Sequence, residues 1–408
     1  MTVQEYVRTL GERAKKASRD LRRISTARKN AALEAVACAL EAAQDEISAA
    51  NARDVAAAKA AGLSAALVDR LALTPERFAS MVRGVREVAS LADPVGRRIW
   101  RRKRPSGIVI EKVREPFGVA VVVFESRPNV FVDTAALCLK TSNAIILRGG
   151  REAVGSNAAL AKAVRAGLLS AGLPEDAVVF VENQDHEAVR ELVRMPEYVD
   201  IAIPRGGERL IRAITEAALV PVLKHYKGVC HVYACSPCDE DMALRILDNA
   251  KVQRPGACNA AETLLVDRRI EKTFMPKVAE WAKRAGVVLH CGEDADFAHE
   301  YLALELNVKV VDGLDEAIEH INNFGSHHSD AIVTSSKTAA ARFLRDVDSA
   351  AVYWNASTRF TDGAEFGMGA EIGISTDKMH ARGPMGLEEL TSYKYIVRGD
   401  AAGGSVRK

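Results

Sequence analysis

Aromatic residues are scarce in this sequence, and neither sign of charge is in excess. Phe, Trp and Tyr together make up 5% of the 408 residues, which argues against an aromatic-rich binding surface. The 56 Lys and Arg residues balance the 54 Asp and Glu residues, so the chain has no overall positive field for nucleic acid or an anionic membrane. We therefore expect neither of these as a partner.

Long hydrophobic runs are also missing. No apolar stretch reaches the ~18 residues of a membrane-spanning helix. Residues 1–20 are rich in charge and lack the apolar core of a signal peptide. The seven cysteines are an odd number and are scattered through the chain, as in proteins of a reducing cytoplasm. The predicted location is therefore cytoplasmic.

The common nucleotide-binding and hydrolase motifs do not occur. The chain has no G-x-x-x-x-G-K-[ST] and no G-x-G-x-x-G after a strand, which disfavours a P-loop kinase and an ordinary Rossmann fingerprint. H-E-x-x-H and G-x-S-x-G are missing as well, so zinc-protease and serine-hydrolase chemistry lack their usual anchors.

The hydrophobic pattern predicts an α/β protein with two domains. Residues 1–92 are rich in Ala, Leu, Glu, Arg and Lys, which favours helices. From Gly118, continuous Val and Ile runs alternate with helical stretches, as in a doubly wound parallel sheet that is buried on both faces. The alternation restarts after about residue 240 and predicts a second sheet. The first four strand-like runs are 118–124, 144–148, 177–181 and 199–203.

Two further segments stand out by composition. Six of the eight residues at 97–104 are basic, and turn residues separate them from the strand-like 108–113, which predicts a hairpin. The basic strand is either a nucleic-acid patch or a solvated or subunit-interface strand. Residues 355–388 are rich in Gly and polar residues, which favours a functional loop over a linker.

Two turns rich in Arg and Gly predict contacts with phosphate. In each turn a buried strand ends at an arginine, and glycines that would let a ligand approach the backbone precede a helix. A plain strand-helix turn explains either one alone, whereas two such turns in one domain favour a dinucleotide. The residues are Arg148, Gly149 and Gly150 in the first turn and Arg205, Gly206 and Gly207 in the second.

Cys258 is the best candidate for a nucleophile. A Pro-Gly pair places it on a loop between a helix and a buried strand, where backbone amides would stabilise a thiolate. The alternative is a small buried hydrophobic residue. Cys230, Cys235, Cys238 and His231 are zinc-ligand types, but neighbouring residues of a strand point to opposite faces. We expect no metal.

Five segments of the chain carry a resemblance to a known family. They are VREPFGVAVVVFESRPNVFVDTAALCLKTSNAIILRGGREA (113–153), IPRGGERLI (203–211), HYKGVCHVY (225–233), VQRPGACNAAETLLV (252–266) and NASTRFTDGAEFGMGAEIGISTDKMHARGPMGLEELTSYKYIVRGD (355–400). Together they span most of the chain after about residue 112. They resemble the γ-glutamyl phosphate reductases, or glutamate-5-semialdehyde dehydrogenases, of the aldehyde dehydrogenase superfamily.

The resemblance implies a reaction and a domain organisation. The reaction is NADPH-dependent reduction of L-glutamyl 5-phosphate to L-glutamate 5-semialdehyde with release of phosphate, the second step of proline biosynthesis, through a thioester on Cys258. The fold is aldehyde-dehydrogenase-like, with two doubly wound α/β domains and a small β arm that forms a homo-oligomer. The expected parts are 1–96 and 114–232 for the cofactor, 233–385 for catalysis, and 97–113 with 386–408 for the arm.

The resemblance also assigns cofactor contacts. Arg148 stands where the superfamily places a lysine against the adenosine ribose and its phosphate, and an arginine there suits the 2′-phosphate of NADPH. Glu300 matches by spacing the glutamate that holds the nicotinamide ribose, with Glu305 as a weaker rival. The other residues assigned to the cofactor are Gly149, Gly150, Pro204, Arg205, Gly206 and Gly207.

Substrate contacts follow from the same resemblance. The segment 125–129 stands where the superfamily carries its oxyanion asparagine, and either Arg127 or Asn129 could take that role. His225 and Lys227 supply positive charge for the phosphate leaving group, and Arg359 is the candidate for the carboxylate of the amino acid. The residues expected to bind substrate are Glu125, Ser126, His225, Lys227, Asn355, Ser357 and Arg359.

One departure from the superfamily bears on the mechanism. Hydrolytic members carry a glutamate that activates water against the thioester, whereas HYKGVC (225–230) has no carboxylate. A CoA-acylating aldehyde dehydrogenase also lacks this group and is the alternative function. A basic-arm RNA-binding or zinc-stabilised interaction protein is a rival of another class. A complex with glutamate 5-kinase, which makes the acyl phosphate, is a further expectation.

Overall fold

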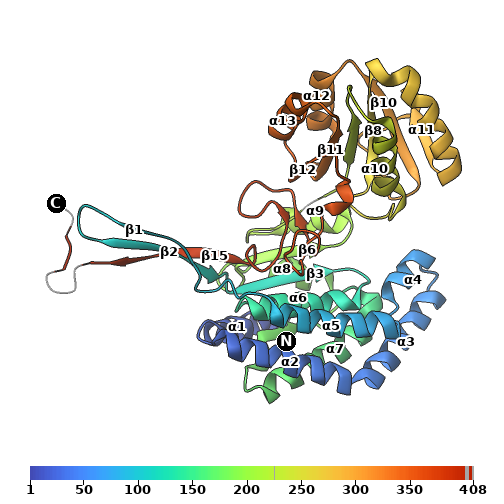
Figure 1. Cartoon of the computed structure of the whole chain (residues 1–408). Coiled ribbons are helices and arrows are strands. Elements are labelled where there is room, and N and C mark those ends of the chain that lie inside the picture. The colour runs from blue at the N-terminus through green and yellow to red at the C-terminus, as the bar shows by residue number, and fades with distance from the viewer. Residues whose placement is uncertain (225, 400–403, 407–408) are drawn as a thin grey trace. The chain divides into compact units, whose positions relative to one another are not determined.

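The computed structural model describes residues 1–224, 226–399 and 404–406, and its backbone divides into two compact units (Figure 1). Unit 1 comprises Met1–Leu223, Met368–Gly373 and Met385–Lys408, and unit 2 comprises Lys224–Gly367 and Ile374–Pro384. The division falls after residue 223, whereas the resemblance implies a boundary after residue 232. Within the described residues, no helix combines the length and the apolar character needed to cross a membrane.

Unit 1 begins with helices, as the composition of residues 1–92 predicts. The first starts with a capping box, in which Glu5 N–H donates to Thr2 Oγ1 at 3.2 Å and Thr2 N–H donates to Glu5 Oε2 at 2.8 Å. The fifth is capped by Thr74 and has Pro75 in its first turn. The helices are α1 (Val3–Leu21), α2 (Thr26–Ala42), α3 (Gln44–Ala60), α4 (Ala65–Leu71) and α5 (Pro75–Ser90).

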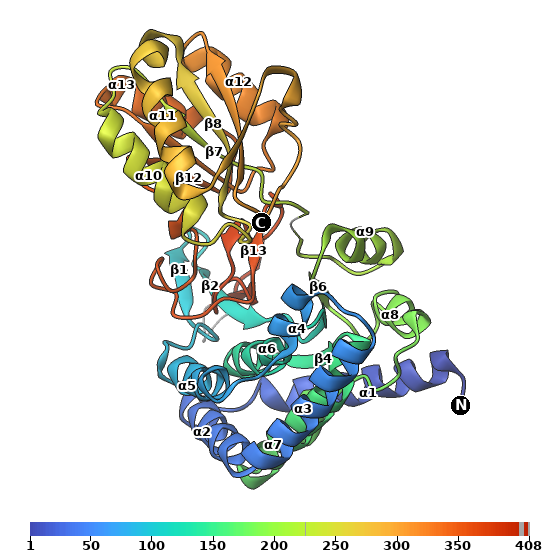
Figure 2. The ribbon, with the colours of Figure 1, turned by 90° about the vertical axis from the view of Figure 1, so that its right-hand side faces the viewer.

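A parallel four-stranded sheet forms the centre of unit 1, in the order β5-β4-β3-β6. Figure 2 labels two of its strands, β4 and β6, among the helices of the same unit. Every residue of β3 and β4 is buried, which confirms that the uninterrupted Val and Ile runs are strands covered on both faces. The strands are β3 (Val119–Phe124), β4 (Ala144–Arg148), β5 (Val178–Phe180) and β6 (Ile201–Arg205). The helices after them are α6 (Pro128–Lys140), α7 (Val154–Ser170), α8 (His186–Leu192) and α9 (Glu208–Ala217).

The strand order determines where a ligand would bind to unit 1. The chain runs from β3 outward to β4 and β5 and then returns to β6 on the other side of β3. Ligands of open α/β sheets bind outside the carboxyl ends of the strands at such a switch point. The segments 125–129, 148–150 and 205–207 follow the carboxyl ends of β3, β4 and β6, so the topology brings these three predicted segments to one edge.

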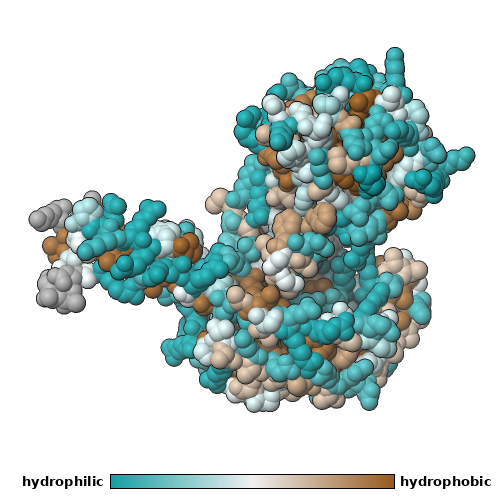
Figure 3. Space-filling view, in the orientation of Figure 1, coloured by the Kyte–Doolittle hydropathy of each residue, from teal (hydrophilic) through white to brown (hydrophobic). Residues whose placement is uncertain are grey.

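A three-stranded antiparallel sheet, called the arm, also belongs to unit 1. Its pairing confirms the predicted hairpin, and its third strand lies within residues 386–408, which were expected in the arm. Part of its positive charge is neutralised internally, because Glu111 binds Arg98 at 3.0 Å and also accepts from Arg398. Figure 3 shows mostly hydrophilic residues on the visible side of the arm. The strands, with β2 in the middle, are β1 (Arg98–Lys103), β2 (Val109–Pro116) and β15 (Thr391–Arg398).

Unit 2 is built on a parallel six-stranded sheet in the order β12-β11-β7-β8-β10-β9. Apolar residues of α10 and α11 cover one face, and residues of α12 and α13 cover the other. The strands are β7 (Cys230–Ala234), β8 (Ala261–Asp267), β9 (Val288–Cys291), β10 (Glu305–Val311), β11 (Ser329–Val333) and β12 (Ala351–Trp354). The helices are α10 (Glu240–Val252), α11 (Glu271–Ala285), α12 (Leu314–Phe324) and α13 (Lys337–Asp346). This second doubly wound sheet confirms the predicted fold class.

The polar segment 355–388 contains little regular structure, as its composition predicts. It holds one 3₁₀ turn and a short antiparallel pair of strands, β13 (Ile374–Ser375) and β14 (Gly383–Pro384). The 3₁₀ turns of the chain are η1 (Arg151–Ala153), η2 (Glu175–Ala177), η3 (Arg268–Ile270), η4 (Gly292–Asp294) and η5 (Thr358–Phe360).

Helix α7 packs closely on α2, and we expect Gly167→Ala to lower the free energy of unfolding by about 1–3 kcal/mol. A side-chain carbon at Gly167 would lie 2.6 Å from Val36 Cα, and a neighbouring backbone cannot move cheaply. Gly84→Ala in α5 is the matched control. A side-chain carbon at Gly84 would have Asp133 Oδ1 at 3.9 Å as its nearest described neighbour. The higher helix propensity of alanine should therefore raise the free energy of unfolding by about 0.5–1 kcal/mol. Urea unfolding measures both variants, and changes of the same sign would contradict the interpretation.

Candidate active site

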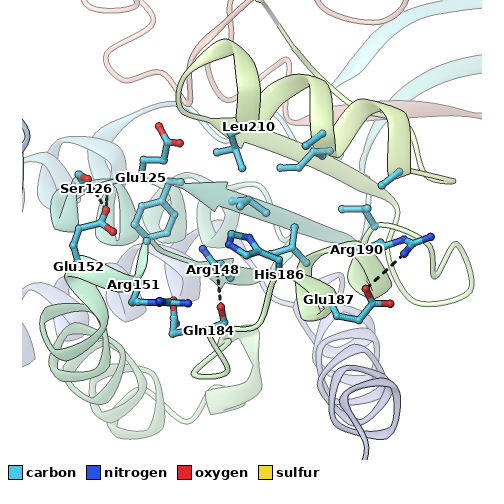
Figure 4. Close-up of a pocket in the computed structure, with 18 of the residues that line it drawn as sticks. Glu125, Ser126, Arg148, Arg151, Glu152, Gln184, His186, Glu187, Arg190 and Leu210 are labelled. Atoms are coloured by element: carbon cyan, nitrogen blue, oxygen red, sulfur yellow. Dashed lines mark hydrogen bonds and ion pairs between the residues drawn. The ribbon is translucent and has the colours of Figure 1, made fainter.

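The carboxyl edge of the sheet in unit 1 opens into a cavity of about 750 Å³ (Figure 4). Side chains from the ends of β3 and β4 line its floor, and α8 and α9 contribute apolar side chains such as Val189 and Ile214. Charged side chains lie between these apolar side chains, as in sites that hold a cofactor. The charged residues that line the cavity are Glu125, Arg148, Arg151, Glu152, Glu187 and Arg190.

Arg148 is the last residue of β4 and is 7% exposed. Its Nη2 donates to the Gln184 carbonyl oxygen at 3.1 Å, whereas its buried Nε has no acceptor among the described residues. Burial lowers the pKa of Arg148, and the nearby Glu152 partly opposes this change. A buried guanidinium with an unused N–H group favours an anion, which fits the predicted phosphate contact.

Gly149 and Gly150 stand where a side chain would collide with its neighbours. A side-chain carbon at Gly149 would lie 2.0 Å from Asn157 Nδ2, and one at Gly150 would lie 2.2 Å from Glu152 Oε1. Asn157 is fully buried, and its amide oxygen and nitrogen have no partner among the described residues. The turn after β4 is therefore tightly packed, and the amide of Asn157 beside it is unpaired among the described residues. A ligand that contacts the backbone of this turn could bind that amide.

The turn after β6 presents the N-terminus of α9. Gly207 is the N-cap residue of this helix, and its N–H donates to Glu125 Oε2 at 3.0 Å. Gly206 lies close to the same carboxylate, since a side-chain carbon there would be 2.6 Å from Glu125 Oε2. Pro204 is buried in β6, and Arg205 ends the strand. A helix N-terminus favours negative charge, and here the carboxylate of Glu125 supplies it.

The segment 125–129 is held in place by a second carboxylate. Ser126 has a left-handed backbone with φ of 37°. Its N–H donates to Glu152 Oε1 at 2.8 Å, and its hydroxyl binds the same oxygen. A non-glycine residue in this region is strained, and such strain occurs at functional sites. Glu152 has no signal in the sequence, because only the fold brings η1 against this segment.

The two oxyanion candidates occupy the start of α6. Arg127 is its N-cap residue, and Asn129 lies in the first turn. Asn129 Nδ2 donates to Asp133 Oδ2 at 2.9 Å, which uses one of its two hydrogens. Burial raises the pKa of Asp133 to about 6, while the hydrogen bond from Asn129 and the charge of Arg205 act in the opposite direction. The role of either candidate stays a prediction.

In unit 2, Cys258 lies on a loop of two consecutive turns between α10 and β8. Ala257 N–H donates to the Arg254 carbonyl at 3.1 Å, and Ala260 N–H donates to the Ala257 carbonyl at 2.9 Å. The loop packs tightly against Gly228, where a side-chain carbon would lie 1.8 Å from the Cys258 carbonyl oxygen. The half-buried thiol is thus placed by backbone contacts on both sides.

A fully buried ion pair joins the two ends of this loop. Lys251 Nζ at the end of α10 lies 3.0 Å from Glu262 Oε2 in β8, and both side chains are 0% exposed. The same oxygen accepts from Tyr301 N–H at 3.3 Å. Burial raises the pKa of Glu262 to about 7, and the charge of Lys251 opposes this change. The pair ties the base of the Cys258 loop to the segment that contains Glu300.

The two candidates for the ribose-binding glutamate have different surroundings. Glu300 Oε1 accepts from Gly228 N–H at 2.8 Å, next to the Cys258 backbone. Glu305 Oε2 lies 2.9 Å from His290 Nε2 at the edge of the sheet. The position beside Gly228 favours Glu300 over Glu305, and its contact with a ribose stays a prediction.

The predicted substrate residues of unit 2 differ in their contacts. Asn355 binds both the N–H and the carbonyl of Thr334, at 2.9 and 3.1 Å. Its amide is therefore engaged by the backbone that follows β11. Ser357 Oγ accepts from Arg359 N–H at 3.2 Å and caps η5.

Lys227 Nζ donates to the Ala298 carbonyl at 3.4 Å. His225 lies outside the described residues. Their predicted contacts with substrate stay predictions.

Arg359 is different, because it holds the Cys258 loop. Its Nε donates to Gln253 Oε1 at 3.0 Å, and its Nη1 donates to Asn259 Oδ1. Asn259 Nδ2 in turn donates to the Thr361 carbonyl at 2.9 Å. Residues 359–361 therefore pack directly on the residues that flank Cys258.

Two of the residues of zinc-ligand type, Cys230 and His231, have other partners. His231 Nδ1 lies 2.8 Å from Asp330 Oδ1, and Cys230 Sγ donates to the Cys258 carbonyl at 3.3 Å. In the part of the chain that the structure describes, no group of three or more His, Cys, Asp or Glu side chains is arranged to hold a metal ion.

The raised pKa of Asp133 predicts a pH dependence of stability. Between about pH 4 and 6 the folded state keeps a proton that the unfolded chain loses, so stability falls as the pH rises. From pH 4.5 to 8 this group should lower the unfolding free energy by about 1–2 kcal/mol. Asp133→Asn should remove that part of the decrease, whereas Glu216→Gln, at an exposed position of α9, should not. Urea unfolding at both pH values measures the difference, and an unchanged pH dependence in Asp133→Asn would contradict it.

Comparisons with known proteins agree with this arrangement. Residues 2–298 match the aldehyde dehydrogenase family. The gamma-glutamyl phosphate reductase of Thermotoga maritima is 43% identical over 98% of this chain and 100% of that chain, with a TM-score of 0.96. The gamma-glutamyl phosphate reductase of Saccharomyces cerevisiae is 33% identical over 98% of this chain and 99% of that chain, with a TM-score of 0.56.

A more distant match concerns the fold alone. An acetylating aldehyde dehydrogenase from Geobacillus thermoglucosidasius is 16% identical over 100% of this chain and 98% of that chain, with a TM-score of 0.71. The predicted α/β architecture and the predicted family are both confirmed. The chain belongs to the aldehyde dehydrogenase family and, within it, to the gamma-glutamyl phosphate reductases.

Proposed function

We propose that this chain reduces L-glutamyl 5-phosphate to L-glutamate 5-semialdehyde with NADPH and releases inorganic phosphate, the second step of proline biosynthesis. The observation that carries this function is the 43% identity, over nearly the whole chain, to a gamma-glutamyl phosphate reductase. The geometry around Cys258 supports the covalent chemistry that the reaction needs.

Cys258 is the nucleophile in this proposal. Its thiolate attacks the acyl carbon and forms a C–S bond, while the C–O bond to phosphate breaks and phosphate leaves with the bonding pair and takes up a proton. The Cys258 N–H has no acceptor among the described residues and is therefore available to the oxyanion. One such donor typically contributes about 3 kcal/mol to the transition state. A side chain from Arg127 or Asn129 is the proposed second donor.

The cavity of unit 1 fits a dinucleotide. The unused Nε of Arg148 suits a phosphate, and Gly149 and Gly150 carry no side chain that would cover the backbone of the first turn. Bound NADPH supplies the hydride that reduces the thioester. Cys258 then holds the product as a thiohemiacetal alkoxide, which collapses by breaking the C–S bond and returns the thiolate and the aldehyde.

The sequence of the segment before β7 supports reduction rather than hydrolysis. A hydrolytic enzyme needs a carboxylate to activate water, and HYKGVC supplies none. The nearby Glu300 carboxylate accepts from the backbone N–H of Gly228. In our proposal Glu300 holds the nicotinamide ribose. The thioester then reacts with hydride and not with water.

The remaining substrate contacts and the partners are also proposals. Lys227 and His225 are candidates for the phosphate, and Arg359 is a candidate for the amino-acid carboxylate. The arm would pair with a second copy of the chain, and glutamate 5-kinase would deliver the unstable acyl phosphate. All seven cysteines are free thiols in the structure, which supports a reducing cytoplasm as the location.

Cys258→Ser should abolish the reaction while leaving cofactor binding intact. The assay runs in reverse, with pyrroline-5-carboxylate, NADP and inorganic phosphate, and follows the absorbance of reduced nicotinamide. The wild type should reduce NADP only when phosphate is present. Cys291→Ser, at an exposed thiol of β9, is the matched control and should keep full activity. Activity of Cys258→Ser would refute the nucleophile, and a requirement for CoA in place of phosphate would indicate a CoA-acylating aldehyde dehydrogenase.

Arg148→Gln should weaken binding of NADPH far more than binding of NADH. A charge-assisted hydrogen bond is worth about 1.5–3 kcal/mol, so the Kd for NADPH should rise about 10- to 100-fold, with a small change for NADH. Arg194→Gln, at an exposed position just beyond α8, should change neither value. Fluorescence titration of both reduced cofactors measures the Kd values. An equal loss for both cofactors would contradict a contact with the 2′-phosphate.

A further inference from the structure

Two arginines lie at the loop that carries Cys258, Arg254 within the loop and Arg359 in η5. Arg359 reaches the loop at both ends through its hydrogen bonds to Gln253 and Asn259. Gln253 immediately precedes Arg254, and Asn259 immediately follows Cys258. The guanidinium of Arg359 therefore lies across the segment that holds both Arg254 and the nucleophile.

The backbone of Arg254 is fixed while its side chain is exposed. Its carbonyl accepts from Ala257 N–H at 3.1 Å in a turn with Pro255 and Gly256 at the two central positions. This turn holds Arg254 at the start of the loop, four residues before Cys258 in the sequence. The Arg254 side chain reaches solvent, whereas Arg359 is half-buried.

The two guanidinium groups are close enough to influence each other. Burial lowers the pKa of Arg359, the positive charge of Arg254 lowers it further, and Cys258 and Asp362 act in the opposite direction. Neither arginine forms an ion pair with a carboxylate within the described residues. Two adjacent positive charges without a counter-ion favour an anion between them or beside them.

We propose that Arg254, supported by Arg359, binds the phosphoryl group of the acyl phosphate and the inorganic phosphate that leaves. The inference rests on the proposed function and names a contact that the sequence analysis missed. A guanidinium binds two phosphate oxygens at once, and its charge stabilises the negative charge that grows on phosphate as the C–O bond breaks. In the reverse reaction the same contact places phosphate against the thioester.

This assignment differs from the one drawn from the resemblance. There, His225 and Lys227 take the phosphate and Arg359 takes the amino-acid carboxylate. Lys227 Nζ already donates to the Ala298 carbonyl, whereas Arg254 is exposed on the nucleophile loop itself. The sequence held only one signal for Arg254, the Pro-Gly turn that follows it.

The test compares Michaelis constants in the reverse assay. Arg254→Gln should raise the KM for inorganic phosphate about 10- to 100-fold and leave the KM values for NADP and the semialdehyde within twofold. Arg254→Lys should recover part of the loss, since it restores the charge without the planar fork. Arg245→Gln is the matched control, an exposed arginine of α10, and should change none of the constants.

Two results of this assay would overturn the proposal. One is a raised KM for the semialdehyde with an unchanged KM for phosphate, which would assign Arg254 to the amino-acid carboxylate. The other is no change in either constant. Failure of the proposed function is recognised separately, because the wild type itself would then show no dependence on phosphate.

A second measurement needs no turnover. Alkylation of Cys258 by anionic iodoacetate is compared with alkylation by neutral iodoacetamide. Arg254 should favour the anionic reagent in the wild type, and inorganic phosphate should remove that preference selectively. In Arg254→Gln the ratio of the two rates should fall at least threefold and lose its response to phosphate. An unchanged ratio in the folded variant would refute an anion site at Arg254.

Discussion

The buried ion pair between Lys251 and Glu262 determines the shape of the loop that carries Cys258. Its partners stand on either side of the loop, one at the end of α10 and one in β8, and both are excluded from solvent. Each charge depends on the other, because an unpaired charge in such a place costs several kcal/mol. The base of the loop is therefore closed, and Gly228 packs against its backbone from the other side. These contacts position the thiol of Cys258 through its backbone, while the thiol itself stays half-buried.

Carboxylates play a comparable role at the cavity of unit 1. Glu125 accepts the N–H of Gly207 at the start of α9, and Glu152 accepts two hydrogen bonds from Ser126. Both carboxylates accept from backbone N–H groups, and Glu152 also holds a strained backbone. The result is one edge of the sheet on which positive and negative groups alternate around an apolar interior. Such an edge combines the area needed by a nucleotide with the charge needed by its phosphates.

The chemistry of the nucleophile loop follows from which charges surround it. The segment HYKGVC (225–230) lacks the carboxylate that would activate water, and Arg254 and Arg359 supply positive charge instead. In the proposed reaction, these features would favour departure of the phosphate and protect the thioester from hydrolysis. The Glu300 carboxylate is engaged by a backbone N–H in unit 2. Loop geometry and charge therefore point to the same reaction as the family.

Local patterns in the sequence were enough to determine the elements of this protein. Continuous Val and Ile runs marked the strands, the Pro-Gly turn placed Cys258 on a loop, and Arg-Gly turns marked the ends of β4 and β6. These signals depend on near neighbours in the chain, so they can be recognised without the fold. The family followed from long motifs of the same local kind.

Only the tertiary structure decided which polar atoms meet. It paired Lys251 with Glu262, engaged both sides of the Asn355 amide at Thr334, and placed Glu300 rather than Glu305 beside Gly228. It also set Arg359 across the Cys258 loop. The reason is physical: a hydrogen bond forms only within a few tenths of an ångström of its proper length. That precision depends on strand register and on the packing of distant loops, which residue spacing does not specify.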